Sequence, residues 1–206
     1  SYDAIIAKYD ASGEIEWRKS FGGSSSDYFN AVVATQDGGC IAVGYSKSTD
    51  LDMAGLSKGY EDAIIVKYDA SGEIEWKRSF GGNGGDYFNA VAVTDDGGYI
   101  AAGYSYSTGG DMAGLKKGYE DAIIVKYDVL GNIEWKRSFG GSDRERFTSI
   151  AATKDGGYIA TGYSYSSDGD MAGLNKGYDD AIIVKYDALG NIEWKRSFGG
   201  SDWDYF

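Results

Sequence analysis

The chain has 206 residues, of which 42% are apolar, and it carries a net charge of −12 with no His and no Pro. A protein that binds nucleic acid usually presents a basic stripe that neutralises phosphates, so no nucleic-acid partner is expected for this acidic chain. No stretch approaches the roughly 20 apolar residues of a membrane helix, so no membrane insertion is expected. The single Cys40 excludes a disulfide framework within the chain.

The chain is built from a repeat. The tetrapeptide DAII begins at Asp3, Asp62, Asp121 and Asp180, which gives a constant spacing of 59 residues. A fixed period of this kind is typical of a protein made from repeated supersecondary units. The sequence holds about three and a half repeats.

Each repeat predicts four strands in the same order. DYFNAVAVT (86–94) and GGYIAAGYSYS (97–107) flank an Asp-Gly turn signal and predict a hairpin. DAIIVKYD (121–128) is a nearly continuous apolar run, which indicates a strand covered on both faces. NIEWKRSF (132–139) alternates and predicts a strand with one buried face. No window has a helical period, so helices should be nearly absent.

Four short strands per repeat with Gly-rich turns are typical of a propeller blade, so we predict an all-β fold, a β-propeller of four-stranded antiparallel blades. Complete blades are expected at 27–80, 86–139 and 145–198, with a half blade at 3–21 and the start of another at 202–206. A β-solenoid is the alternative, although its coils are usually shorter. Because propellers have about 4–8 blades, closing the ring should require further repeats of a longer chain or a homo-oligomer.

Three stretches carry a resemblance to a known family: DAIIVKYDALGNIEWKRSFGGS (180–201), DGGYIA (155–160) and DGDMAGL (168–174). They are similar to repeats of the seven-bladed β-propeller repeat family and of Gly-Gly-rich bacterial surface proteins, and the resemblance covers the whole chain. It implies an extracellular or cell-surface propeller without assigned chemistry. No catalytic residue comes with it.

One Trp and one Glu recur side by side in every repeat. The Trp residues could be stacking platforms for sugars, but one regular Trp per blade is more typical of packing between blades. Glycoside hydrolysis needs two carboxylates in different environments, whereas these Glu residues are identical copies, which should instead pair with Lys or Arg. We therefore expect no enzyme. The two series are Trp17, Trp76, Trp135 and Trp194, and Glu16, Glu75, Glu134 and Glu193.

The DGG turns and Cys40 have structural explanations. Asp37, Asp96 and Asp155 are expected to accept backbone N–H bonds at the hairpin turns. Cys40 stands where the other repeats have Tyr, and it is expected to be a small buried residue without a metal or disulfide partner.

The long connector between the second and third strands of each repeat is the candidate metal site. Asp-x-Asp next to Gly permits Ca²⁺ binding, which gives Asp50, Asp52, Asp168 and Asp170 as possible ligands, whereas the middle copy keeps only Asp111. The alternative is an Asx-type turn that orders the connector, with its Met and Leu packed on the blade. The connector lysines are expected to form a solvated face and to balance nearby acids. The lysines are Lys58, Lys117 and Lys176, and the acids include Glu61, Glu120 and Asp179.

The repeats differ most where the fourth strand leads into the next first strand. The four versions are SSSDYF, NGGDYF, SDRERF and SDWDYF. Variation on one face of a regular scaffold suits a binding surface, and unselected change in exposed loops is an equal alternative. Replacing the two arginines with Ala should weaken any ligand bound there. The candidate binding residues are Tyr28, Tyr87, Arg144, Arg146, Trp203 and Tyr205.

These observations predict a non-catalytic, secreted or cell-surface module that binds a protein or glycan through this loop face. The alternative is a structural or self-assembling repeat scaffold without a small-molecule ligand. A glycan-active enzyme is disfavoured, because catalysis needs unlike groups that converge, whereas repeated blades supply copies of one environment.

Overall fold

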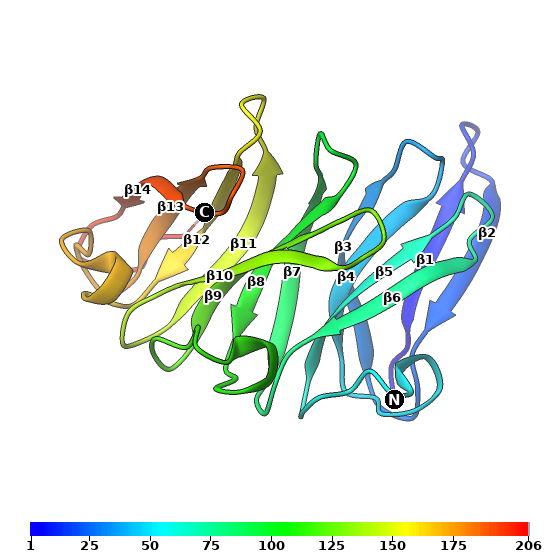
Figure 1. Cartoon of the computed structure of the whole chain (residues 1–206), viewed down its shortest axis with the longest axis horizontal. Helices are drawn as coiled ribbons and strands as arrows, with labels where there is room; N and C mark the ends of the chain where they lie inside the picture. The colour runs from blue at the N-terminus through cyan, green and yellow to red at the C-terminus, as the bar shows by residue number, and fades with distance from the viewer. Residues whose placement is uncertain (206) are drawn as a thin grey trace.

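The computed structural model describes residues 1–205, so Phe206, the last residue of the predicted segment 202–206, lies outside the described residues. Three four-stranded antiparallel sheets and one strand pair stand side by side in chain order (Figure 1). The predicted all-β architecture of four-stranded antiparallel sheets is confirmed. The three-residue 3₁₀ turns in the connectors are the only helical elements within the described chain.

The strand pair consists of β1 (Ala4–Tyr9) and β2 (Ile15–Phe21). The first sheet consists of β3 (Asp27–Ala34), β4 (Cys40–Ser46), β5 (Asp62–Tyr68) and β6 (Ile74–Phe80). The second sheet consists of β7 (Asp86–Val93), β8 (Tyr99–Ser105), β9 (Asp121–Tyr127) and β10 (Ile133–Phe139). The third sheet consists of β11 (Glu145–Ala152), β12 (Tyr158–Ser164), β13 (Asp180–Tyr186) and β14 (Ile192–Phe198).

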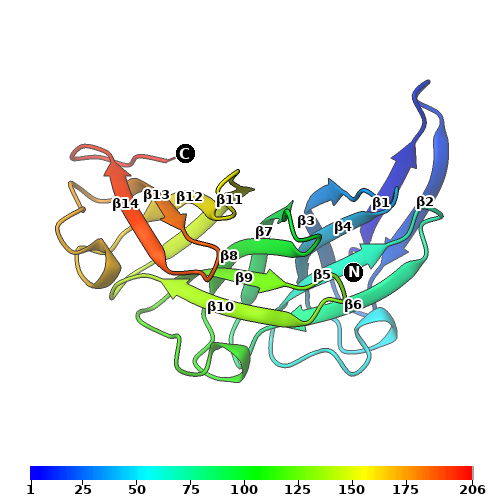
Figure 2. The ribbon, with the colours of Figure 1, turned by 45° about the horizontal axis from the view of Figure 1, so that its top comes forward.

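Successive sheets contact one another mainly through their first strands. Strand β7 contacts β3 and β4 of the preceding sheet, and β11 contacts β7 and β8 in the same way. The repetition of one contact mode bends the row into an arc, which Figure 2 shows from a second direction. Over residues 1–205 the arc stays open. No helix in this part of the chain is long and apolar enough to cross a membrane.

Burial of the strands follows the predicted pattern with one exception. The DAIIVKY strands are covered on both faces: every residue of β5 and β9 is buried. The IEWKRSF strands do not alternate cleanly. At the end of β10 both Ser138 and Phe139 are buried, and at its start the pairing shifts register between Ile133 and Trp135. This bulge adds one residue to β10 opposite β9, so the simple odd–even rule breaks at the start of the strand.

Aromatic side chains fill the space between neighbouring sheets. Phe139 on β10 lies 5.9 Å, centroid to centroid, from Phe147 on β11, and both are fully buried. The Trp135 indole N–H donates to the Ala188 carbonyl in the turn of the next sheet, at 3.2 Å. Trp17 and Trp76 donate in the same way, so the prediction that these residues pack between neighbouring repeats is confirmed for all three.

A bulge in β3 and another in β7 each add a polar link between sheets. Asn89 is the extra residue between Phe88 and Ala90 of β7, and its amide N–H donates to the Phe147 carbonyl at 2.8 Å. Asn30 on β3 bonds Phe88 equivalently. The bulge therefore aims a side chain at the next sheet, a common use of bulges.

The long connectors fold back onto the sheets, as the packing alternative predicted. Each contains one 3₁₀ turn, and the Met at its end is fully buried, as Met112 is between the first and second sheets. The first residue of the turn has a left-handed backbone in all three copies. Gly110 and Gly169 adopt it freely at φ 62° and 57°, whereas Leu51 adopts it at φ 49° against its side-chain preference. The three turns are η1 (Leu51–Met53), η2 (Gly110–Met112) and η3 (Gly169–Met171).

Candidate functional site

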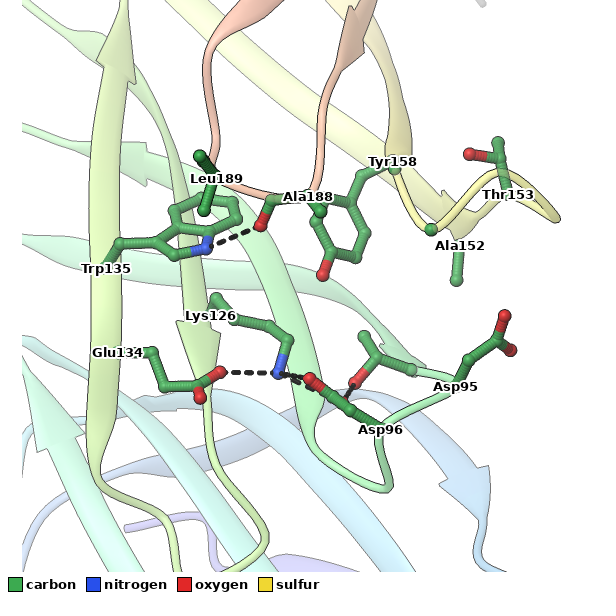
Figure 3. A pocket seen from close by; sticks show the side chains of 13 residues that line it. Asp95, Asp96, Lys126, Glu134, Trp135, Ala152, Thr153, Tyr158, Ala188 and Leu189 are labelled. Carbon is green, nitrogen blue, oxygen red and sulfur yellow. Dashed lines mark hydrogen bonds and ion pairs between the residues drawn. The ribbon is translucent and has the colours of Figure 1, made fainter.

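A cleft of about 450 Å³ lies between the second and third sheets, at the end that carries the DGG hairpins. Figure 3 shows that Lys126 lies between two carboxylates at its edge. The ammonium Nζ is 2.9 Å from Oδ2 of Asp96 and 2.7 Å from Oε2 of Glu134. Trp135 and Tyr158 supply the apolar wall.

The charged groups in this cleft stabilise one another in their ionised forms. Burial lowers the pKa of Lys126, but hydrogen bonds to Glu134 and Asp96 outweigh it, so the pKa is raised overall. Burial likewise opposes ionisation of Asp96, yet bonds from Thr94, Lys126 and the Gly98 N–H lower its pKa to about 2. The third ammonium hydrogen bond goes to the Tyr127 carbonyl. An ammonium has three N–H donors, and all three are used here, so none is left for a substrate.

The same triad recurs at the other hairpins. Lys67 pairs with Asp37 and Glu75, and Lys185 pairs with Asp155 and Glu193. The Asp of each DGG turn also accepts the backbone N–H of its second Gly, which confirms the prediction for these turns. The recurring Glu residues pair with Lys as expected. This arrangement stabilises the hairpins.

Cys40 changes the equivalent cleft between the strand pair and the first sheet. It stands in the place of the buried Tyr99 and Tyr158, and the cleft beside it measures about 440 Å³. Cys40 is half-buried, so the prediction of a buried residue is only partly right. Burial raises the pKa of its thiol, which disfavours the reactive thiolate.

The connector aspartates bind backbone N–H groups. Asp50 accepts from the Ser24 N–H at 2.8 Å and Asp52 from the Gly22 N–H at 3.1 Å. Asp168 accepts from the Ser142 N–H and Asp170 from the Gly140 N–H, at 2.7 and 2.9 Å. Within residues 1–205 no three His, Cys, Asp or Glu side chains gather as a metal site. Calcium at these positions stays a prediction.

The connector lysines pair with a different acid from the one expected. Lys58 Nζ lies 2.6 Å from Asp111 Oδ2 in the next connector, and it also donates to the Ser79 carbonyl. Lys117 contacts Asp170 in the same way. The predicted pairing of these two lysines with Glu61 and Glu120 is therefore wrong, because neighbouring connectors approach each other across the gap between sheets.

The opposite end of the sheets carries three equivalent polar–aromatic clusters. Each is formed by four positions that recur every 59 residues. One of the four is an acid, whose backbone forms a parallel β-bridge with the segment that leads into the next repeat. We name them clusters I, II and III. Cluster I is Tyr45, Lys47, Glu61 and Tyr87; cluster II is Tyr104, Tyr106, Glu120 and Arg146; cluster III is Tyr163, Tyr165, Asp179 and Tyr205.

Cluster I holds a lysine ammonium. Lys47 Nζ lies 2.5 Å from Oε1 of the buried Glu61, and 5.7 Å from the ring centroid of Tyr60. Tyr45 and Tyr87 meet edge to face at 4.8 Å, although they belong to different sheets. The pKa of Lys47 is raised, and the largest cause is the hydrogen bond that its ammonium donates to Glu61.

Cluster II holds an arginine guanidinium. Arg146 donates through Nε and Nη2 to the fully buried Glu120, and through Nη2 to the Tyr106 hydroxyl at 3.0 Å. The guanidinium carbon lies 4.0 Å from the ring centroid of Tyr104, a cation–π contact. Burial raises the pKa of Tyr104 to about 12.

Cluster III has the same frame with no cation from within residues 1–205. The Tyr205 hydroxyl donates to Asp179 Oδ2 at 2.6 Å, and Tyr163 meets Tyr205 edge to face at 5.0 Å. Asp179 is fully buried, and its Oδ1 has no hydrogen-bond partner in the described chain. The bond to Asp179 raises the pKa of Tyr205.

The candidate binding residues all lie at this end of the molecule, but they differ in how exposed they are and in whether other residues already bind them. Tyr28 and Tyr87 are half-buried in ring contacts with Tyr45, and Arg146 is held by Glu120. Arg144 is exposed and lies 5.2 Å from the Tyr119 ring centroid. Trp203 is 67% exposed and Tyr205 is 50% exposed.

Sequence reasoning missed the remaining members of the clusters. Tyr45, Tyr104 and Tyr163 lie in the second strands, and the acids Glu61, Glu120 and Asp179 precede the third strands. Their partners come from other strands and often from the next sheet, so local patterns give no hint of contact. An alignment of the repeats contains the signal that could have found them. Lys47 stands at the second cluster position where the other repeats have Tyr, and Arg146 stands at the fourth position where the other repeats have Tyr.

No family model matches the chain. It is similar to the regulatory protein FlaEY of Caulobacter vibrioides, with 28% identity over 189 residues, which is 88% of this chain and 19% of that protein. The chain thus spans about a fifth of the length of that relative. It also resembles the crystal structure of a Bacteroides caccae protein of unknown function, with a TM-score of 0.50, 14% identity, and coverage of 98% of this chain and 60% of that one. At that identity, the likeness concerns the fold alone.

Proposed function

We propose that the chain is part of a β-propeller and serves as a non-catalytic, secreted or cell-surface binding module for a protein or glycan. In this proposal the sheets are blades, their first strands line the centre, and the ligand contacts the face that carries clusters I to III. The observation that carries the proposal is a series of Tyr rings in mutual contact across clusters I and II on this face.

This series of Tyr rings crosses the boundary between the first and second sheets. Tyr28 stacks on Tyr45 at 4.9 Å, Tyr45 meets Tyr87 at 4.8 Å, and Tyr87 stacks on Tyr104 at 4.6 Å. Tyr106 continues the series from Tyr104 at 6.0 Å. Tyr rings give a binding surface large contact area with little entropy loss, and their hydroxyls add hydrogen bonds.

The opposite face supports a structural explanation instead. Its lysine and carboxylate groups are satisfied by one another and recur unchanged at each hairpin. The cluster face varies between repeats, which is how a regular scaffold can be adapted to one ligand. A non-catalytic role agrees with carboxylates that occupy near-identical environments, since acid–base chemistry needs groups of contrasting pKa.

Glycan and peptide arrays test the binding proposal. We expect a ligand whose affinity falls about ten-fold or more in Trp203→Ala and in Arg144→Ala, because both side chains are exposed on the cluster face. The charge-matched control is Lys154→Ala, an exposed residue in the third hairpin turn at the other end of the sheet, which should leave affinity unchanged. A ligand that responds equally to all three variants would contradict the proposed face.

Arg146→Ala is a poor first test of binding. The substitution would leave the buried carboxylate of Glu120 without its guanidinium. Breaking a buried ion pair in this way costs about 3–5 kcal/mol of folding free energy, so a loss of binding would not separate ligand contact from unfolding.

A second candidate function, a self-assembling scaffold, is favoured by the outer face of the third sheet. Phe198 is 71% exposed, whereas its equivalent Phe139 is fully buried by the next sheet. Trp194 is 38% exposed, and its indole lacks the carbonyl acceptor that Trp135 finds at Ala188 in the described chain. The equivalent of Ala188 in the strand pair is Ala11. A second copy of the chain, docked by its strand pair, would extend the same interface.

Light scattering tests the scaffold proposal. We expect the mass of this 206-residue chain to rise with concentration above the monomer value, and Phe198→Asp to restore the monomer, because a charge on this face opposes its burial. Val129→Asp, which adds the same charge at an exposed turn, should keep the assembly. A monomer at every concentration would overturn self-assembly and leave the binding proposal intact.

A further inference from the structure

The three clusters differ in where their positive charge comes from. Cluster I takes an ammonium from its second position, Lys47, and cluster II takes a guanidinium from its fourth position, Arg146. In cluster III those two positions are Tyr165 and Tyr205. The acid is kept in all three, as Glu61, Glu120 and Asp179, and it is buried in all three.

A buried carboxylate without a paired cation is costly, and in the described part of the chain no Lys or Arg forms an ion pair with this acid. Asp179 is paired with no Lys or Arg within residues 1–205, and its Oδ1 is buried and without a hydrogen bond. Clusters I and II show how the same frame is completed when a cation is present. In cluster III, Asp179 Oδ1 is therefore an unused acceptor that is available to a cation from outside the chain.

The surroundings of Asp179 suit an organic cation. Tyr163 and Tyr165 lie 6.0 Å apart, and Tyr205 packs against Tyr163 at 5.0 Å, so aromatic rings flank the carboxylate. Tyr faces attract ammonium and guanidinium groups, as Tyr104 does with Arg146. Tyr205, whose hydroxyl bonds Asp179, is half-exposed, whereas Asp179 itself is fully buried beneath it. The net charge of −12 draws cations to the chain.

We propose that cluster III is a binding site for an alkylammonium or alkylguanidinium group, the chemistry found at the end of a lysine or arginine side chain. The external cation takes the role that the Lys47 ammonium and the Arg146 guanidinium have in clusters I and II, and it pairs with Asp179. This inference rests on the proposed binding function and names the ligand chemistry for one part of the cluster face.

Butylammonium, a lysine side-chain mimic, is the first probe, titrated at constant ionic strength with Trp fluorescence and calorimetry as readouts. We expect saturable binding with one site per chain. A capped Gly-Lys-Gly peptide, with Gly-Gln-Gly as its control, then distinguishes a side chain on a peptide from a free amine. Binding of butylammonium but not of the lysine peptide assigns the site to free amines, and binding of both assigns it to peptide side chains as well.

Two variants remove the site by different routes. Asp179→Asn removes the charge while keeping the shape, and Tyr165→Lys supplies an internal ammonium, as Lys47 does in cluster I. Each substitution should lower the affinity for butylammonium about ten-fold or more. The matched control Asp202→Asn, an exposed acid in the same segment, should bind as the unmodified chain does. Circular dichroism checks that each variant is folded.

A third variant creates the site elsewhere. Arg146→Tyr gives cluster II the three tyrosines of cluster III around a buried acid, Glu120 in place of Asp179, so the number of butylammonium sites should rise from one to two. A folded Arg146→Tyr variant that keeps one site would overturn the inference, as would absent saturation in the unmodified chain or an equal loss in Asp202→Asn. Retained array binding that depends on Trp203 alongside failed butylammonium binding would reject this inference and keep the proposed function.

Discussion

Gly103→Ala is expected to destabilise the protein by about 4 kcal/mol or more, the range reserved for substitutions with a specific steric cause. Gly103 on β8 faces the bulge of β7, where the backbone carbonyl of Tyr87 comes directly over its α-carbon. A β-carbon at Gly103 would lie far inside van der Waals contact with that carbonyl oxygen. A backbone group in a paired strand cannot move away without breaking the ladder.

The matched control for Gly103→Ala is Gly109→Ala. Gly109 has a negative φ of −128°, and the nearest atom to an added β-carbon is 3.9 Å away. Urea unfolding of the two variants should therefore give a large loss of free energy for Gly103→Ala and a change within about 0.5 kcal/mol for Gly109→Ala. Equal and small changes in both would mean that β7 and β8 do not approach as described.

Phe139→Ala is expected to cost about 3–5 kcal/mol, the usual loss when a buried Phe is truncated in a core. Phe139 is fully buried between the second and third sheets, where it packs against Phe147. The lost contacts include the ring pair and the apolar surface around Met171. Because this cluster joins two sheets, its truncation weakens their interface as well as β10 itself.

Phe198→Ala provides an unusually close comparison, because the two residues share the local sequence IEWKRSFGGSD. Phe198 is 71% exposed, so its truncation in the monomer should change the free energy of unfolding by about 0.5 kcal/mol or less. Chemical denaturation at low protein concentration measures both variants. Similar losses at the two positions would show that intrinsic strand preference, and not burial between sheets, sets the contribution of this Phe.

Much of the fold could be predicted because its signals are local and repeated. The Asp-Gly turn before GGYIA predicts a hairpin, and the apolar run DAIIVKY predicts a strand covered on both faces, and both are observed. The bulges were missed. Asn89 reads as an ordinary strand residue, and its role depends on the Phe147 carbonyl of the next sheet.

The candidate site was less accessible to sequence reasoning, because its contacts join different strands and sheets. Arg146 looked like a free loop residue, yet its charge is used by Glu120, which lies 26 positions earlier. Lys126 looked like a polar break in an apolar strand, yet it joins two carboxylates at the hairpin. Charge pairing of this kind depends on three-dimensional proximity, which periodicity alone does not specify.

The links between neighbouring sheets have a consequence for how the chain can change length. Trp135 bonds Ala188, and Trp76 bonds Val129, each 53 positions further along, and Asn89 bonds Phe147 at a separation of 58. Each sheet thus interacts with its immediate neighbours, as in a nearest-neighbour array. Removing or inserting a whole period therefore recreates the same kinds of junction, whereas a change by any other number of residues breaks several of them together.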